Sequence, residues 1–450
     1  MKPSRQDSRP ADSPQTSLSW PWKAGAIACL ALAVFAPGLY AASFVDEYAY
    51  IAQSFYADLF FEGQFNHPLW LKGFASDLQP LPKYLIGLSL RLAHLPMPTP
   101  ADAAKWYGDY AKFGAPATLI AARLPFIALG ALGCVAIFAC GVQIKDGRVG
   151  TIAAALLMLN PLYRLHAHRA MSDVPCEAFM LVALGLSLWG WRRTWYRGLG
   201  VVAFVLPWLA GLAAGLSLLC KFNGFLGLMI IVSWCGIACV TPGLSWARKI
   251  AISAGMIVTI LVALATFVAL NPFLTARPGG ALSPEARDLR KQNPWGRFLF
   301  QVRLRGAFSD NQKINFPNDA LFTIAEKTKV VVVQGFGRFG PFGRSESDST
   351  VRFHSRQDWG MILWVPLVLL GLIESLRLGR SQLRAGRPPA AIALVVWTAL
   401  AWTVVTVYLP MAWDRYLLPI QSGNALLAAL AASTIWDRLV RRGPVAETGT

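Results

Sequence analysis

Residues 24–50, AGAIACLALAVFAPGLYAASFVDEYAY, carry a long apolar stretch directly into two adjacent carboxylates, Asp46 and Glu47. About 20 apolar residues of helix cross the hydrocarbon core of a bilayer, so the first part of this stretch predicts a membrane span. A carboxylate at the centre of a membrane helix costs roughly 2.5–3.5 kcal/mol even on the gentler insertion scales. An acid pair at the mouth of a span therefore predicts a working site. We expect Asp46 to be its principal residue and Glu47 to act beside it.

The composition of the whole chain agrees with a membrane protein. Of its 450 residues 55% are hydrophobic and only 15% are charged, and the mean hydropathy is +0.45. Soluble globular domains carry about 25% charged residues, so that class is excluded. The net charge of +18 could suggest a nucleic-acid partner, but a basic chain this apolar is better explained by Lys and Arg in cytoplasmic loops. We therefore expect membrane lipids and no nucleic acid as partners.

Ten apolar stretches are candidates for membrane spans, although some are short. They lie near 24–45, 119–141, 149–164, 174–190, 199–219, 222–240, 250–270, 360–376, 389–410 and 416–436. The predicted fold class is an all-α polytopic membrane protein with about ten or more transmembrane helices and two long outer loops. The first stretch could instead be a cleaved signal peptide, because the small residues of YAAS follow its apolar core.

The charges between the spans predict the orientation of the chain. If the N-terminus is cytoplasmic, every loop on that side is basic, and the opposite loops hold nearly all of the acids. The sequence thus predicts a multi-pass protein of the plasma (inner) membrane with both termini cytoplasmic. Asp46 and Glu47 then lie on the outer face. The seven cysteines fall in or beside apolar stretches, where a thiol behaves as a small hydrophobe, and predict no disulfide framework.

The long outer loops divide the chain into units. We expect a tail at 1–23, a main transmembrane module at 24–270 that includes outer loop 46–118, an outer loop at 271–359, transmembrane helices at 360–436 and a tail at 437–450. Both tails are polar and predicted to be disordered.

Three segments of these outer loops carry local patterns. DEYAYIAQSFYADLFF (46–61) predicts an amphipathic helix with its aromatic face in the headgroups, and QPLPKYLIGLSLRLAH (79–94) predicts a second interfacial helix. KVVVVQGFGRFG (329–340) is strand-like and has the glycine spacing of a dinucleotide-binding loop, but no βαβ pattern surrounds it. We interpret that last segment as a flexible Gly/Phe turn that could act as a lid.

Cationic side chains recur in the segments assigned to the outer face. They are Lys83, Arg164, His166, His168, Arg169, Lys221 and Arg415, with Asp173 and Asp414 among them. Cations facing a carboxylate pair suit a phosphate-linked substrate that reacts at the carbon next to the phosphate, because they hold the leaving phosphate and offset its charge. A carboxylate can then take a proton from an incoming hydroxyl.

Each of these residues also has a plainer interpretation. Lys83 and Lys221 could snorkel to lipid phosphates, and Arg415 could be an interfacial anchor. Arg169 and Asp173, four residues apart, could form a structural ion pair. His166 and His168 could bind a metal with Asp173, or remain solvated.

The order of these motifs resembles a known family. The first span followed by DE, then PLPKYLIGL (80–88), RLPFIALGAL (123–132), HAHRAMSD (166–173), GLSLLCKFNG (215–224) and DRYLLPI (414–420) is similar to the polyprenyl-phosphate-dependent membrane glycosyltransferases of the GT-C fold. The resemblance is to family 39, in particular the protein O-mannosyltransferases and the related aminoarabinose transferases that modify lipid A. It runs through residues 24–270 and returns at the last two spans.

This resemblance implies an enzyme that transfers a sugar from a polyprenyl-phosphate donor to a hydroxyl acceptor on the outer face, usually with inversion. It implies that Asp46 is the catalytic carboxylate with Glu47 in the same motif, and that Asp173 is a second acidic position. It implies that Lys83, Arg169 and Arg415 contact the donor phosphate. Some members bind a divalent metal near these acids and others do not, so a metal on Asp46, Asp173 and His168 stays open.

The resemblance leaves the acceptor open, and two other function classes remain: a transporter, and a non-catalytic membrane scaffold or inactive enzyme, against which the acids and cations argue. QPLPKY replaces the adjacent prolines that are more common in relatives, which affects the placement of Lys83. A transporter or flippase for a lipid-linked sugar would also place cations and interfacial helices around a phosphate. Transporters commonly show paired halves with helices broken at the midplane, and the sequence shows neither feature.

Overall fold

The computed structural model describes residues 19–105, 113–198, 200–341 and 358–441. In these ranges the regular structure is helical, and one isolated bridge pairs Ala320 with Met411. The tails predicted to be disordered lie largely outside the described residues, as do parts of both long loops. All seven cysteines are free thiols.

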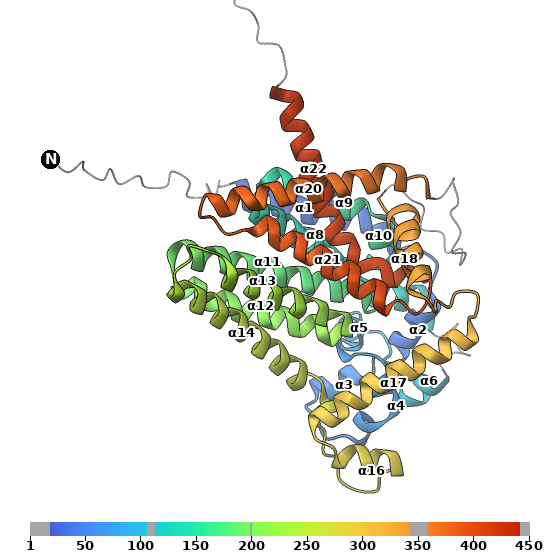
Figure 1. The fold of residues 1–450 in the computed structure, drawn as a ribbon. Helices are drawn as coiled ribbons and strands as arrows, with labels where there is room; N and C mark the ends of the chain where they lie inside the picture. Colours follow the sequence, from blue (N-terminus) through green and yellow to red (C-terminus); the bar gives the residue numbers. More distant parts are fainter. Residues whose placement is uncertain (1–18, 106–112, 199, 342–357, 442–450) are drawn as a thin grey trace, which may run out of the picture.

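Helices long and apolar enough to cross a membrane form most of the molecule, and nine of them occur in the described ranges. They are α1 (Ser19–Phe35) continued by η1 (Ala36–Tyr40), α8 (Pro116–Ile144), α11 (Asp173–Arg197), α12 (Val201–Cys220), η3 (Phe222–Gly224) continued by α13 (Phe225–Val240), α14 (Trp246–Ala269), α20 (Met361–Arg384), α21 (Ala390–Tyr408) and η5 (Asp414–Ile420) continued by α22 (Gln421–Arg441). Figure 1 shows them side by side in one bundle. Nine of the ten predicted spans are therefore present as long apolar helices.

The tenth predicted span is a shorter helix, α9 (Gly147–Leu159), whose 13 residues measure about 20 Å. Just before α9, Lys145 contacts Asp437 near the end of α22 (Nζ–Oδ2, 3.2 Å). Just after α9, the Asn160 side-chain amide donates to Gln421 at the start of α22 (3.0 Å). α9 thus runs antiparallel to α22 and returns the chain from one end of the bundle to the other. The start of α1 lies at the same end as Asp437, since Trp20 contacts Phe138 in the second half of α8.

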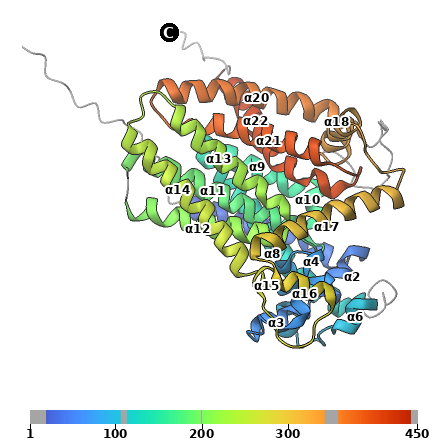
Figure 2. The same ribbon diagram turned by 60° about the horizontal axis from the view of Figure 1, so that its bottom comes forward.

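A lobe of short helices lies beyond one end of the bundle (Figures 1 and 2). One group follows α1 in the chain: α2 (Val45–Ala52), α3 (Tyr56–Phe61), η2 (Pro68–Leu71), α4 (Gly73–Asp77), α5 (Pro80–Leu92) and α6 (Pro100–Lys105). The other group follows α14: α15 (Pro272–Thr275), α16 (Pro284–Lys291) and α17 (Pro294–Asn315). The two groups contact each other, since α16 packs on η2 and α17 packs on α4. Parts of the two long loops predicted from the sequence therefore build one body, while residues 324–338 of the second loop pack on the bundle instead.

The predicted location of the aromatic residues in the headgroups is wrong. The segment 46–61 forms two helices, α2 and α3, and its tyrosines are buried inside the lobe. Tyr56 is 1% exposed and packs on Trp70, while Phe60 stacks on Tyr84 with ring centroids 4.3 Å apart. The rings pack on one another because chain segments far apart in the sequence supply an aromatic core that an isolated helix lacks.

The strand-like interpretation of residues 329–333 is also wrong, because this run ends a helix, α18 (Ile324–Val333). Thr323 and Glu326 form a capping box that starts the helix: the Thr323 hydroxyl accepts from the Glu326 amide, and the Glu326 carboxylate accepts from the Thr323 amide. The glycines that follow begin in η4 (Gln334–Arg338), a π-helical turn. Gly335 lies close against Ile420, so this turn packs on η5.

Candidate active site

Charged side chains from distant segments meet at the end of the bundle that faces the lobe. They come from the start of α2, the first half of α8, the turn between α10 (Pro161–Ala167) and α11, the α12–α13 junction and η5. Each of these segments carries one of the motifs singled out in the sequence. The fold therefore gathers most of the predicted site at one surface.

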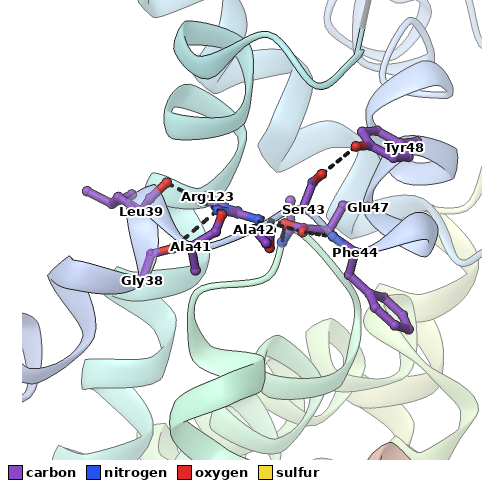
Figure 3. Close-up of polar contacts among 10 residues, drawn as sticks. Gly38, Leu39, Ala41, Ala42, Ser43, Phe44, Glu47, Tyr48 and Arg123 are labelled. Carbon is purple, nitrogen blue, oxygen red and sulfur yellow. Dashed lines mark hydrogen bonds and ion pairs between the residues drawn. The ribbon is translucent and has the colours of Figure 1, made fainter. Parts of the chain in front are cut away.

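Glu47 lies at the centre of a buried network that Arg123 completes (Figure 3). Arg123 Nε donates to Glu47 Oε1 (2.8 Å), and Arg123 Nη2 donates to Glu47 Oε2 (2.7 Å). The same carboxylate accepts from the backbone amides of Phe44 and Ala170, each at 2.9 Å. Glu47 and Arg123 are 0% and 1% exposed. Every oxygen of Glu47 is thus occupied.

Arg123 also fixes the chain between α1 and α2. Its guanidinium donates to a series of backbone carbonyls in that link, those of Gly38, Leu39, Ala41 and Ala42, at 2.7–3.2 Å. A buried ion pair is stable only where its remaining hydrogen-bonding groups are satisfied, and this one meets that condition. We refer to Arg123, Glu47 and these carbonyls as the Arg123 network. The sequence analysis gave Arg123 no role, although it is the first residue of the RLPFIALGAL motif and an arginine within an apolar helix of 29 residues.

Asp46 has a different environment from its neighbour. It lies in the first turn of α2, where the helix dipole favours a negative charge, and its carboxylate pairs with Arg415 Nη1. The Asp46 side chain is 32% exposed and that of Arg415 is 18% exposed. The guanidinium of Arg415 also lies over the rings of Trp413 (4.8 Å) and Tyr416 (5.8 Å). This pair is open to solvent on one side.

A second ion pair lies close by, between Lys221 Nζ and Asp173 Oδ1 (2.6 Å). Asp173 begins α11 and is 3% exposed, while Lys221 is 23% exposed and lies 5.6 Å from the centroid of the Tyr416 ring. Tyr416 is therefore a common neighbour of Lys221 and Arg415. In this structure the predicted pair of Arg169 with Asp173 is replaced by the pair with Lys221.

Arg169 differs from these cations because it has no ion pair with any residue that the structure describes. Its guanidinium lies 4.1 Å from the centroid of the Phe44 ring, and no hydrogen bond or ion pair of this group occurs within the described residues. Partial burial lowers the pKa of Arg169, and Asp414 is the carboxylate that opposes this shift most. A guanidinium stays protonated in proteins. Arg169 is thus a cation ready to accept an anion.

The two histidines of the HAHRAMSD motif have separate environments. His166 is 1% exposed, with Nε2 3.4 Å from Asp414 Oδ2. His168 packs against the backbone of Gly38, and burial together with Arg123 lowers the pKa of His168 to about 4. His168 is therefore neutral near pH 7.

The residues considered for a divalent metal do not form a ligand set. Asp46 pairs with Arg415, Asp173 pairs with Lys221, and His168 packs on Gly38. In the described part of the chain no group of three or more His, Cys, Asp or Glu is placed to hold a metal ion. We therefore derive no step of the chemistry through a metal.

Lys83 lies in the lobe, and no ion pair joins it to Asp46 in the described ranges. It is 1% exposed, its Nζ donates to the Phe74 carbonyl oxygen (2.7 Å), and it lies 5.0 Å from the centroid of the Tyr56 ring. Burial lowers the pKa of Lys83 to about 7. The ammonium is thus inside the lobe rather than at a lipid phosphate as the snorkelling interpretation required.

Comparisons with known proteins identify the fold. No family model matches the chain, and no curated protein matches it. Among solved structures, the archaeal oligosaccharyltransferase AglB from Archaeoglobus fulgidus, in complex with an inhibitory peptide and a dolichol-phosphate, aligns with 94% of this chain at 14% identity and a TM-score of 0.56. ArnT from Cupriavidus metallidurans bound to undecaprenyl phosphate also aligns with 94%, at 14% identity and a TM-score of 0.50.

The chain covers 52% of the AglB chain and 63% of the ArnT chain. It thus spans about half the length of the oligosaccharyltransferase. These likenesses show that the chain has the GT-C fold, and they confirm the fold class predicted from the sequence.

Proposed function

We propose that this protein is a membrane glycosyltransferase that moves a sugar from a polyprenyl-phosphate carrier to a hydroxyl acceptor. The observation that carries the proposal is the placement of Asp46 beside Arg415, with Arg169, which pairs with no acid among the described residues, nearby. A partly exposed carboxylate next to cations suits a reaction that needs a base and a bound leaving phosphate. The structural neighbours contain dolichol-phosphate and undecaprenyl phosphate, which supports this class of donor.

The proposed chemistry is one displacement at the anomeric carbon of the donor sugar. Arg415 and Arg169 hold the donor phosphate, and Lys221 adds positive charge while Asp173 keeps it in place. Asp46 takes the proton of the acceptor hydroxyl as its oxygen bonds to the anomeric carbon on the face opposite the phosphate. The bond from that carbon to the phosphate oxygen breaks, and its electron pair leaves with the polyprenyl phosphate. The transition state has the oxocarbenium character of glycoside chemistry, and the configuration at the anomeric carbon is inverted.

Two of the residues carried over from the family take a structural role in this proposal. Glu47 has no free oxygen, so we assign it to holding the start of α2 and thereby Asp46. Lys83 is buried against Phe74, so we assign it to the packing of the lobe rather than to the phosphate. Asp46, Arg415 and Arg169 remain as the working residues.

We also propose that the site lies on the outer face of the plasma (inner) membrane and that both termini are cytoplasmic. The opposite end of the bundle carries Lys145, Arg148 and Arg192, with Arg193 and Arg197 in the last turns of α11. Because α9 counts as a crossing, α1 begins and α22 ends at this basic side. Basic loops remain in the cytoplasm, which supports the orientation.

The test is release of free polyprenyl phosphate from a panel of labelled polyprenyl-phosphate sugars by the purified protein, with acceptor-containing membrane extract added. Asp46→Asn should lower the rate about 10²–10⁴-fold. Asp58→Asn is the matched control, because Asp58 also pairs with an arginine, Arg91, and is similarly exposed, at 30%. Release from no donor, or equal release by Asp46→Asn and the wild type, would contradict the proposal.

A further inference from the structure

The two groups that the proposed reaction uses separately are joined to each other in this structure. Asp46 must be free to take a proton, and Arg415 must be free to bind a phosphate, yet they form an ion pair. No other ion pair of Asp46 occurs in the described ranges. Each group is therefore the ion-pair partner of the other in this structure.

Arg415 is held where a phosphate would meet it. Its guanidinium lies over Trp413 and Tyr416, and its backbone amide donates to Asp414 Oδ1 (2.6 Å). Arg415 therefore has neighbours besides Asp46 that keep it in place when its ion pair breaks. Lys221 differs from Arg415 in the exposure of its partner. The Asp173 side chain is 3% exposed, whereas that of Asp46 is 32% exposed.

Asp46 stands on a rigid base. The adjacent Glu47 is fixed by the Arg123 network, so α2 itself stays in place when the Asp46 side chain changes rotamer. Exposed ion pairs contribute little stability, and the Asp46 carboxylate is about one-third exposed. The Asp46 side of this ion pair is therefore the side that can turn toward solvent, because Arg415 is only 18% exposed.

Arg169 offers a first contact for the donor. Its guanidinium has no ion-pair partner in the described ranges and lies near the acidic groups of the site, among them Asp46 and Asp414. Both guanidiniums act on the same carboxylate, Arg415 as the ion-pair partner of Asp46 and Arg169 through its charge. Arginine binds phosphate through two parallel hydrogen bonds, which a single carboxylate contact matches poorly.

On this basis, which rests on the proposed function, we propose that the donor phosphate displaces Asp46 from Arg415. The ion pair acts as a latch: it keeps Asp46 from serving as a base until the donor is bound. The exchange imposes an order on the reaction, with donor first and acceptor second. The carboxylate of Asp46 and the phosphate compete for the same guanidinium, that of Arg415. Because binding free energies are reciprocal, each weakens the binding of the other by the same factor.

The latch predicts an effect opposite to the usual result of removing a site residue. Asp46→Asn abolishes the charge that competes for Arg415, so this inactive variant should bind undecaprenyl phosphate more tightly than the wild type. The expected gain is about two- to fivefold, equivalent to about 0.4–1 kcal/mol. Plain repulsion between Asp46 and the phosphate would also give a gain, so a second variant is needed.

The experiment is a double-mutant cycle on the equilibrium binding of undecaprenyl phosphate to the full-length protein in nanodiscs. It compares the wild type, Asp46→Asn, Arg415→Gln and the double variant, with Asp58→Asn as the control for a change in net charge. The latch requires a gain from Asp46→Asn that disappears in the Arg415→Gln background. The Asp58→Asn protein should bind like the wild type.

The other outcomes separate the latch from the proposed function. Unchanged or weaker binding by Asp46→Asn, or an equal gain in both backgrounds, would overturn the latch while leaving the donor class intact. No binding of undecaprenyl phosphate by any of the proteins would overturn the proposed donor class, and the latch with it.

Discussion

Asp46 and Glu47 are neighbours in the chain but belong to two different regions of the molecule. Glu47 is fully buried, and Arg123 and two backbone amides occupy its oxygens. Asp46 is one-third exposed, and its ion-pair partner in the described part of the chain is Arg415. The difference shows how a short acidic motif can divide its work: one carboxylate fixes the helix, and the other stays available for chemistry. Variants that act on one region alone can test this division.

Removing Arg123 should have the largest effect. Arg123→Ala leaves Glu47 as an unpaired buried charge and strands the carbonyls between α1 and α2, so we expect a loss of about 3–5 kcal/mol in the free energy of unfolding. The measurement is the thermal unfolding midpoint of the detergent-solubilised protein. Arg91→Ala, which breaks exposed ion pairs with Asp58 and Glu62, is the control and should cost about 1 kcal/mol or less. Equal midpoints for the two variants would contradict the network.

Neutralising each acid of the motif in turn should separate the role of Glu47 from that of Asp46. Glu47→Gln keeps the shape of the side chain but weakens its hydrogen bonds to Arg123, which should cost about 1–3 kcal/mol of stability. Asp46→Asn should cost less than about 1 kcal/mol and yet abolish most of the turnover. Thermal midpoints and donor turnover are measured on both variants. If Asp46→Asn proved the less stable of the two, the assignment of roles would be reversed.

Lys83 was predicted to contact the donor phosphate but is buried in the lobe. The pH dependence of stability tests which of these two roles it has. Its pKa of about 7 lies below the ordinary value of 10.5, so between these values the unfolded chain binds more protons than the folded protein. The contribution of Lys83 should therefore make stability rise with pH across this window, by about 1–3 kcal/mol between pH 7 and 9. Lys83→Met should flatten the rise in the thermal midpoint. A Lys83→Met protein with wild-type pH dependence but weakened undecaprenyl phosphate binding would restore Lys83 to the phosphate site.

Tyr50 should give the smallest effect, because it links the two regions through one hydrogen bond. Tyr50 lies one helical turn after Asp46 in α2. Its hydroxyl donates to Ser172 Oγ (2.8 Å), in the link between α10 and α11 that also carries Arg169. Tyr50→Phe should cost about 0.5–1.5 kcal/mol of stability. If the link also orients the site, the undecaprenyl phosphate affinity will fall in parallel. Tyr48→Phe, on the same helix, is a suitable comparison variant for both measurements.

The sequence predicted the fold better than it predicted the contacts. Hydropathy located nine long spans and the shorter α9, because a helix in lipid must be apolar over a fixed length. It could not show that α9 crosses in 13 residues, which depends on its packing against α22. The apolar run of α18 was misread because a short apolar run fits a strand or a helix equally well.

The ion pairs within the site could not be predicted from the sequence, for a related reason. Arg123 lies 76 residues from Glu47, and Arg415 lies 369 residues from Asp46, so no local spacing connects them. Local spacing instead suggested that Arg169 pairs with Asp173, whereas Lys221 takes that carboxylate. Lys83 was assigned to the phosphate from its motif alone, and the packing of the lobe removed it from solvent.

By itself the sequence determined that this chain spans a membrane many times and that acids and cations recur in the segments between the spans. These properties follow from the bilayer, which acts on each segment independently. Only the tertiary structure decided which acid is buried and which is exposed, because burial depends on what distant segments place around a side chain. The same acidic motif thereby acquires a structural carboxylate at Glu47 and an accessible one at Asp46.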